Sequence, residues 1–307
     1  MRSFRVSVVV LLALAVMSPS VFAGGSNVYP NGAEGFWTGA VPPPGMYYIN
    51  YDLWYSSHKF AGNNDDEITA GPLGPFKTDV LAQVSRFLYV SKHQVLGGQW
   101  GAHIFIVYQD VNTRTALGKS HVSNLGDTII DPFVLSWHWP NFHMATGVDI
   151  FLPTGSFEAG RVANTSANVF VFEPIVAVTW NTPLKGFNAS AKFMYDIPTK
   201  NDDFKNPFTG AKGGLLPGQE FHFDYSLDYT INQNLKAGLE GYYYIQTTND
   251  RFRGSDVPNN KGMVFAAGPG IEYSKGRCIV SFKTEFEMTA KNRPEGIANW
   301  LRVVYVF

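Results

Sequence analysis

Residues 220–231 read EFHFDYSLDYTI, and the stretch alternates between apolar and polar side chains at every position. The apolar set is Phe221, Phe223, Tyr225, Leu227, Tyr229 and Ile231, and the polar set is Glu220, His222, Asp224, Ser226, Asp228 and Thr230. Successive side chains of a β-strand point to opposite faces, so this period predicts a strand with one apolar and one polar face. A soluble sheet with its aromatic face in a core could carry the same pattern.

The alternation recurs in about eleven more segments of about ten residues, without a helical pattern to cover them. In chain order they are 46–56, 79–92, 99–109, 128–139, 142–152, 168–180, 187–196, 235–247, 262–273, 278–288 and 298–307. Short turns and long loops alternate between the segments, as in outer-membrane barrels. Because hydrocarbon offers no hydrogen-bond partner, every backbone N–H and C=O in it must pair within the protein. A sheet that closes into a barrel meets this demand, since it leaves no open edge. The prediction is an all-β fold, a transmembrane antiparallel β-barrel of about 12 strands.

The composition agrees with a protein that meets lipid on one side only. Aromatic residues make up 15% of the chain and charged residues only 16%, where about 25% charged is usual in soluble domains. The mean hydropathy is nevertheless −0.08, because an apolar outer face and a polar lumen average out. The formal net charge of −1 gives no electrostatic footprint for nucleic acid. Cys278 is the only cysteine, so a disulfide framework is excluded.

The chain divides into three predicted parts, which are a signal peptide at 1–23, an N-terminal arm at 24–44 and the barrel at 45–307. The first part has two arginines before a short apolar run and ends in a small-residue cleavage pattern. The arm is too rich in glycine and proline for a helix or a central strand. We expect it to enter the lumen from the periplasmic side as a plug; the alternative is a flexible tail. The predicted plug residues are Phe36, Trp37, Pro42, Pro43 and Pro44.

Polar side chains on the faces opposite the aromatic ones predict the pore lining, on the assumption that the aromatic faces lie outside. The predicted lining, which also includes Phe105 of an apolar wall, is Asp52, Arg86, His103, Phe105, Asp149, Glu173, Lys192, His222, Asp224, Lys236, Glu240, Lys283, Glu285 and Arg302. Such residues either brace the wall by ion pairs or form a selective constriction. Val84, Leu88, Phe105 and Val107 predict an apolar wall, and glycines at 101 and 268–270 suggest a sideways exit into lipid.

Enzymatic and metal-binding interpretations find little support in the spacing of residues. His121 and Ser123 lie in a predicted loop rather than on a lipid-facing strand, with no neighbouring acid at strand spacing to orient the histidine. His138 and His143 flank a tight turn, but no third metal ligand follows at a motif spacing. Acidic clusters at 63–67 and 201–203 fit no calcium-loop pattern. We therefore expect no catalytic residue, no metal site and no cofactor.

The last residues, NWLRVVYVF, alternate and end on Phe307, which resembles the signal that outer-membrane barrels present to their assembly machinery. A second resemblance rests on Leu125-Gly126-Asp127, Asp131-Pro132-Phe133, Trp137-His138 and the FLPTG at 151–155, together with the arm sequence GFWTGAVPPPG. These motifs are similar to those of the outer-membrane proteins of the meta-pathway of phenol degradation. The likeness covers about residues 29–307 and implies a monomeric channel for small, partly hydrophobic molecules.

The predicted function is therefore a passive diffusion channel in the outer membrane of a Gram-negative bacterium, for small, partly hydrophobic or aromatic molecules. Its expected partners are outer-membrane lipid and lipopolysaccharide, small solutes and the barrel assembly machinery, and no nucleic acid. Two alternatives remain open at this point. One is a structural or adhesion barrel with a closed lumen, and the other is a lipid-modifying enzyme of the outer membrane.

Overall fold

The computed structural model describes residues 24–307, and the predicted signal peptide at 1–23 lies outside the described residues. The main sheet has 13 strands, of which β4 (Gly118–Leu125) pairs only with β3, so 12 strands form the ring. The ring consists of β1 (Gly45–Ala61), β2 (Lys77–Val95), β3 (Gly98–Thr115), β5 (Thr128–Trp139), β6 (Phe142–Leu152), β7 (Val171–Asn181), β8 (Phe187–Pro198), β10 (Glu220–Asn232), β11 (Leu235–Gln246), β14 (Met263–Lys275), β15 (Cys278–Lys291) and β16 (Arg293–Val306).

Strands that are neighbours in the ring are also neighbours along the chain, and every pairing is antiparallel. The barrel closes where β1 pairs with β16, from Tyr47 opposite Val306 to Ala61 opposite Arg293. Closure leaves no edge of the ring unpaired, as lipid requires. The predicted closed antiparallel barrel of twelve strands is confirmed.

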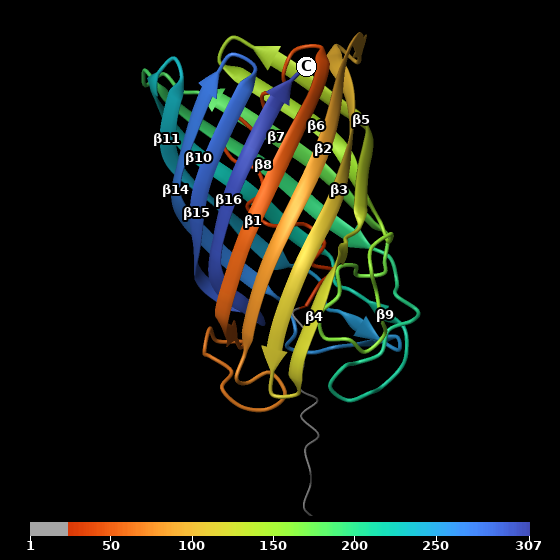
Figure 1. The fold of residues 1–307 in the computed structure, drawn as a ribbon. Coiled ribbons are helices and arrows are strands. Elements are labelled where there is room, and N and C mark those ends of the chain that lie inside the picture. The colour runs from red at the N-terminus through yellow and green to blue at the C-terminus, as the bar shows by residue number, and fades with distance from the viewer. Residues whose placement is uncertain (1–23) are drawn as a thin grey trace, which may run out of the picture.

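Short turns lie at one end of the barrel, beside the C-terminus, and long loops lie at the other (Figure 1). The long-loop end also carries β4 and a small sheet of β9 (Leu215–Leu216), β12 (Arg251–Phe252) and β13 (Ser255–Asp256). The sequence predicted a long loop at 110–127; in the structure this connection is a hairpin, because β3 extends beyond the ring and returns as β4. No helix in residues 24–307 is long and apolar enough to cross a membrane.

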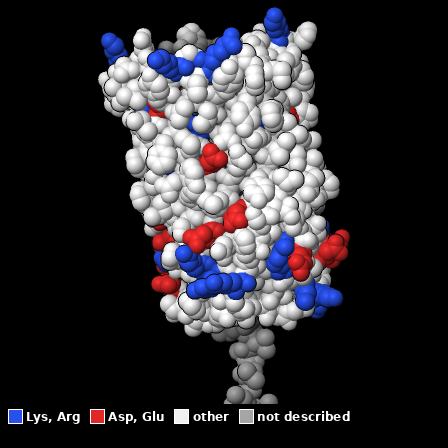
Figure 2. Space-filling model, viewed as in Figure 1, with Lys and Arg blue, Asp and Glu red and all other residues white. Residues whose placement is uncertain are grey.

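The outer surface of the barrel is an apolar belt. Figure 2 shows few charged residues in the middle of the visible face, while Lys, Arg, Asp and Glu gather toward its two ends. On β10, Leu227 and Tyr229 are 56% and 45% exposed, while Asp224 and Asp228 are each 1% exposed. The period-two pattern of 220–231 therefore does place its apolar face toward lipid and its polar face toward the lumen.

Strand β1 has the opposite orientation from the predicted one. Tyr47 and Tyr51 are buried in the lumen, whereas Trp54 is 43% exposed on the outside. Asp52, predicted to line the pore, lies on the outer face, where Asn50 donates a hydrogen bond of 2.7 Å to its carboxylate. The reason is that β1 carries tyrosine on both faces, and a tyrosine ring with its hydroxyl suits a polar lumen as well as a membrane interface.

Candidate functional site: the lumen and its apolar cavity

The N-terminal arm makes hydrogen bonds with lumen residues along the length of the barrel. At the long-loop end, the Gly25 N–H donates to Asp250 over 3.1 Å, and both the Ser26 N–H and its hydroxyl donate to Glu220. At the short-turn end, the Gly39 N–H donates to the Thr179 hydroxyl over 3.0 Å. The arm thus begins beside the long loops and ends beside the short turns, where β1 starts (Figure 1).

Asp224 of β10 fixes the middle of the arm. Its carboxylate accepts hydrogen bonds from the Gly32 N–H at 2.8 Å, the Glu34 N–H at 3.0 Å and the Tyr29 hydroxyl at 2.8 Å. Of the predicted plug residues, Phe36 is 2% exposed, and Trp37 has the Lys236 ammonium 4.4 Å above its ring. Pro42, Pro43 and Pro44 lie at the short-turn end, where the Pro43 carbonyl accepts from the Tyr47 hydroxyl at 2.6 Å.

Glu34 of the arm contacts three cations of the wall, and no pattern in the sequence marked it as a lumen residue. Its carboxylate accepts from Arg86 at 3.1 Å and from Arg302 at 3.5 Å, and its carbonyl accepts from Lys283 at 2.7 Å. The Tyr51 hydroxyl donates to the same carboxylate at 3.2 Å. Because three cations of the wall converge on one arm residue, the arm is part of the lumen's charge balance.

Several other predicted lumen residues form ion pairs with one another. His103 contacts Asp149 at 2.6 Å, and Lys192 contacts the same carboxylate at 3.5 Å. Lys283 contacts Glu285 at 3.1 Å and Glu240 at 3.3 Å.

All the predicted pore residues except Asp52 lie on the lumen side. Those inside are Arg86, His103, Phe105, Asp149, Glu173, Lys192, His222, Asp224, Lys236, Glu240, Lys283, Glu285 and Arg302. Because the lumen wall carries both acidic and basic side chains, many of these residues pair with one another and brace the wall.

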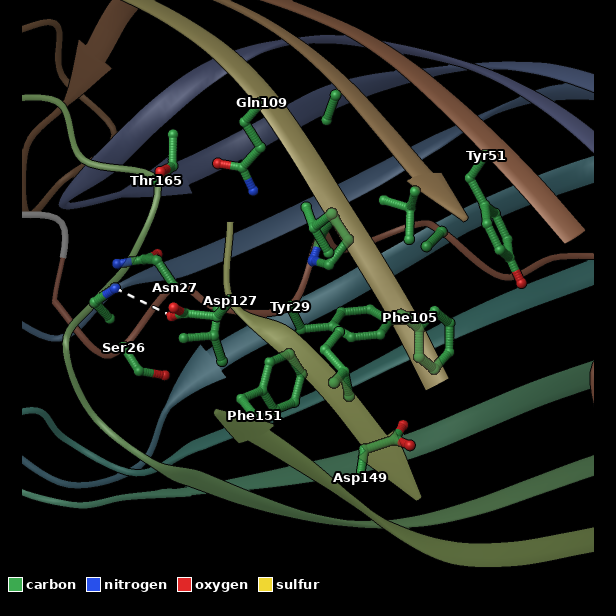
Figure 3. A pocket seen from close by; sticks show the side chains of 18 of the residues that line it. Ser26, Asn27, Tyr29, Tyr51, Phe105, Gln109, Asp127, Asp149, Phe151 and Thr165 are labelled. Carbon is green, nitrogen blue, oxygen red and sulfur yellow. Dashed lines mark hydrogen bonds between the residues drawn. The ribbon is translucent and has the colours of Figure 1, made fainter. Parts of the chain in front are cut away.

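One part of the lumen remains hollow. A cavity of about 1050 Å³, including its part open to solvent, lies between the arm and the wall formed by β2, β3, β5 and β6 (Figure 3). Its wall is apolar where the sequence predicted an apolar wall, with Val84, Phe105 and Val107 each less than 10% exposed. Ile129 and Phe151 extend that wall. Such a concave, mostly apolar space is the usual form of a small-molecule site.

Polar groups stand at the two ends of the cavity. Asp149 lies at one end, and Gln109 and Asp127 lie near the long loops (Figure 3). Lys192 also lines the cavity and contacts Asp149 at 3.5 Å. Burial raises the pKa of the Asp127 carboxyl, although the Ser166 hydroxyl and backbone N–H groups oppose the shift. A solute with an apolar body and one polar end matches this distribution.

The other histidine candidates do not assemble into a site. His121 contacts Asp110 at 2.9 Å, an acid that the sequence did not place beside it, but the Ser123 hydroxyl pairs with Tyr108 at 2.8 Å. No hydrogen bond joins this serine and histidine in the described part of the chain. His138 and His143 contact each other at 2.9 Å beside a short turn, and they belong to no cluster of three metal-ligand types within 24–307.

Comparison with known proteins adds a family and a fold. A family profile described as "Putative MetA-pathway of phenol degradation" matches residues 58–303. No curated protein matches the sequence. Among solved structures, an outer membrane channel from Pseudomonas putida F1 is similar, with a TM-score of 0.76 and 14% identity over 87% of this chain and 97% of that one. At that identity the likeness shows the fold, which is that of an outer-membrane barrel.

Two other solved barrels are less similar. A deltaS2S3 mutant of the TodX monoaromatic hydrocarbon channel has a TM-score of 0.48 and 10% identity, over 87% of this chain and 91% of that one. The beta domain of the Bordetella autotransporter BrkA also has a TM-score of 0.48 and 10% identity, over 86% and 100%. Likeness this weak assigns no property to the present chain.

Proposed function

Because the chain belongs to the MetA-pathway of phenol degradation family, we propose that it is a passive diffusion channel of the outer membrane for small, partly hydrophobic or aromatic molecules. The observation that supports the proposal best is the apolar cavity beside the arm, whose wall includes Val84, Phe105 and Val107. A water-filled diffusion channel for sugars or ions would instead have polar side chains around its bore.

In this proposal the arm at 24–44 is the plug of the channel. Its hydrogen bonds to Asp224, Glu220 and Thr179 hold it inside the lumen, and it leaves the cavity as the hollow part. Solutes that enter from the long-loop end therefore reach the apolar wall before they meet the most heavily charged part of the lumen.

An exit route sideways into lipid belongs to the same proposal. The pairing of β5 with β6 is interrupted between Ile130 and Leu135, a stretch that includes Pro132, which has no N–H to donate. Asp149 of β6, opposite this interruption, lines the cavity. A weak seam beside an apolar cavity would release a hydrophobic solute into the membrane.

The channel is proposed to work as a monomer that contacts outer-membrane lipid and lipopolysaccharide. Phe307 is 67% exposed at the end of the chain, which suits a signal read by the barrel assembly machinery. No catalytic role and no nucleic-acid partner belong to the proposal.

Uptake into liposomes tests the proposed function. Vesicles containing the protein should take up benzoate faster than a sugar of similar size, and vesicles without protein set the background for each solute. Equal rates for the two solutes would contradict an apolar route.

The competing candidate is a structural barrel with a closed lumen. The observation that favours it is the complete burial of several lumen acids, among them Glu173, Asp196 and Glu285 at 0% exposure. If neither benzoate nor the sugar enters vesicles faster than background, the structural barrel becomes the better assignment.

A further inference from the structure

Three strands in succession around the ring each bring one side chain that can ligate a metal ion to the same point of the lumen. Glu173 comes from β7, Asp196 from β8 and His222 from β10. Their exposures are 0%, 0% and 1%, so bulk water does not reach them. The candidate ligand atoms all lie within 4.8 Å of one another.

The polar atoms of these three side chains lack hydrogen bonds. Both carboxylate oxygens of Glu173, both of Asp196 and both ring nitrogens of His222 are buried without a hydrogen-bond partner in the described residues. Buried polar side chains are nearly always hydrogen-bonded, because burying an unsatisfied one removes its hydrogen bonds to water without replacing them. Several unsatisfied atoms that converge on one point indicate a bound species that would satisfy them together.

The distances within the cluster fit a metal ion better than direct hydrogen bonds. The His222 Nε2 lies 3.4 Å from Glu173 Oε2 and 3.4 Å from Asp196 Oδ2. Charge-assisted hydrogen bonds are usually about 2.7–2.9 Å long. With bonds of about 2.1 Å from a tetrahedral ion to nitrogen and oxygen ligands, the ligands stand about 3.4 Å apart.

The surroundings leave negative charge for a cation. Lys192 is 4.0 Å from Glu173, but it lies closer to Asp149, at 3.5 Å, and so it is shared between two acids. The Tyr29 ring of the arm lies 4.9 Å from the His222 ring and covers it. We propose that Glu173, Asp196 and His222 bind one divalent metal ion of the zinc class, with a solvent molecule as fourth ligand.

A second cluster in the same lumen provides the contrast. His103, Asp131 and Asp149 are also close enough to hold an ion. There, however, the histidine uses both nitrogens, one with Asp149 at 2.6 Å and the other with the Arg86 guanidinium at 2.8 Å. A cation would displace these hydrogen bonds and meet a guanidinium, so this cluster is not assigned a metal and serves as a control.

Cobalt binding tests the proposal, because four-coordinate Co²⁺ has intense visible ligand-field bands. The full chain is refolded into detergent with Co²⁺ present, so that the ion has access before the arm covers the site, and unbound metal is then removed. We expect one equivalent of Co²⁺ with four-coordinate bands, displaced by Zn²⁺. His222→Gln should weaken binding by more than about 100-fold, beyond the loss typical of an outer-shell partner, while Asp131→Asn should bind as the wild type does.

Either of two results would overturn the proposal. One is that the wild-type protein forms no stoichiometric cobalt complex, and the other is that the cobalt bands are unchanged in His222→Gln. If His222→Gln does not fold, as judged by its mobility in unheated gels, Glu173→Gln replaces it under the same criteria. Neither result affects the proposed transport role, which is measured by solute uptake in the metal-free protein.

Discussion

A single added side chain at Gly39 should release the arm from the wall. Gly39 is buried, and a Cβ built on it would lie 2.4 Å from the carbonyl carbon of Val178 and 2.6 Å from the Thr179 nitrogen. These are backbone atoms of β7, held by strand pairing on both sides, so they cannot move aside as a flexible side chain would. Gly39→Val therefore forces the arm, rather than the wall, to move.

The size of the effect follows from the contacts that are lost. Ordinary contacts begin near 3.4 Å, so the arm must retreat by about 1 Å, which breaks the hydrogen bond from the Gly39 N–H to Thr179. That bond contributes about 1 kcal/mol, and the overpacking destabilises the docked arm by about 1 kcal/mol or more. A loss of about 2 kcal/mol in arm docking raises the undocked fraction about 30-fold.

Single-channel recording in planar bilayers measures this fraction. If the arm is the plug, Gly39→Val should show large-conductance openings about 30-fold more often than the wild type, and deletion of 24–40 should be open permanently. Gly45→Ala is the matched control, because its added Cβ makes only an ordinary contact of 3.4 Å with Tyr47. Identical traces for Gly39→Val, the deletion and the wild type would refute the plug.

Three further predictions concern other parts of the barrel. Asp52→Leu should stabilise the protein by about 1–2 kcal/mol, because a charged side chain leaves the lipid-facing surface; denaturant unfolding in vesicles measures this, and equal or lower stability contradicts it. Glu34→Gln leaves Arg86 without a carboxylate partner and Arg302 with Glu272 alone, so it should destabilise by about 3 kcal/mol and shift the reversal potential toward anion selectivity; an unchanged potential would count against the charge balance described. Val107→Thr keeps the side-chain shape but places a hydroxyl on the apolar wall, so benzoate uptake should fall several-fold while sugar uptake stays constant; an unaffected benzoate rate would remove Val107 from the route.

The strand positions could be predicted from the sequence because lipid and lumen impose opposite demands on successive residues. The segment predicted at 142–152 is β6, and the one predicted at 278–288 lies within β15. Strand ends were less accurate, since β1 continues to Ala61 beyond the predicted end at Ser56. The alternation weakens where a strand leaves the membrane, because both faces then meet polar surroundings.

The orientation of β1 could not be predicted, because counting charges does not identify its inner face. Asp52 is the charged residue of the segment 46–56, and it lies outside, whereas the inner face carries Tyr47 and Tyr51. Those tyrosines face inward because the arm supplies partners for them: the Pro43 carbonyl and the Glu34 carboxylate. The orientation of the strand thus depends on a segment whose path the alternation does not describe.

The interior of the barrel depends on register, which brings together residues that no local motif relates. Glu173 and Asp196 are 23 positions apart along the chain, and Asp196 and His222 are 26 positions apart. A short turn lies in the first interval and a long loop lies in the second. Asp196 stands opposite Glu220 and Met194 opposite His222 across one strand pair, and the β6 register places Glu173 opposite Asp149. A slip of one residue between two strands would turn one of the three side chains to the lipid face. Metal-site spacings are recognisable from sequence only where one turn or one helix holds the ligands. A site whose ligands come from successive barrel strands follows from the pairing of those strands alone.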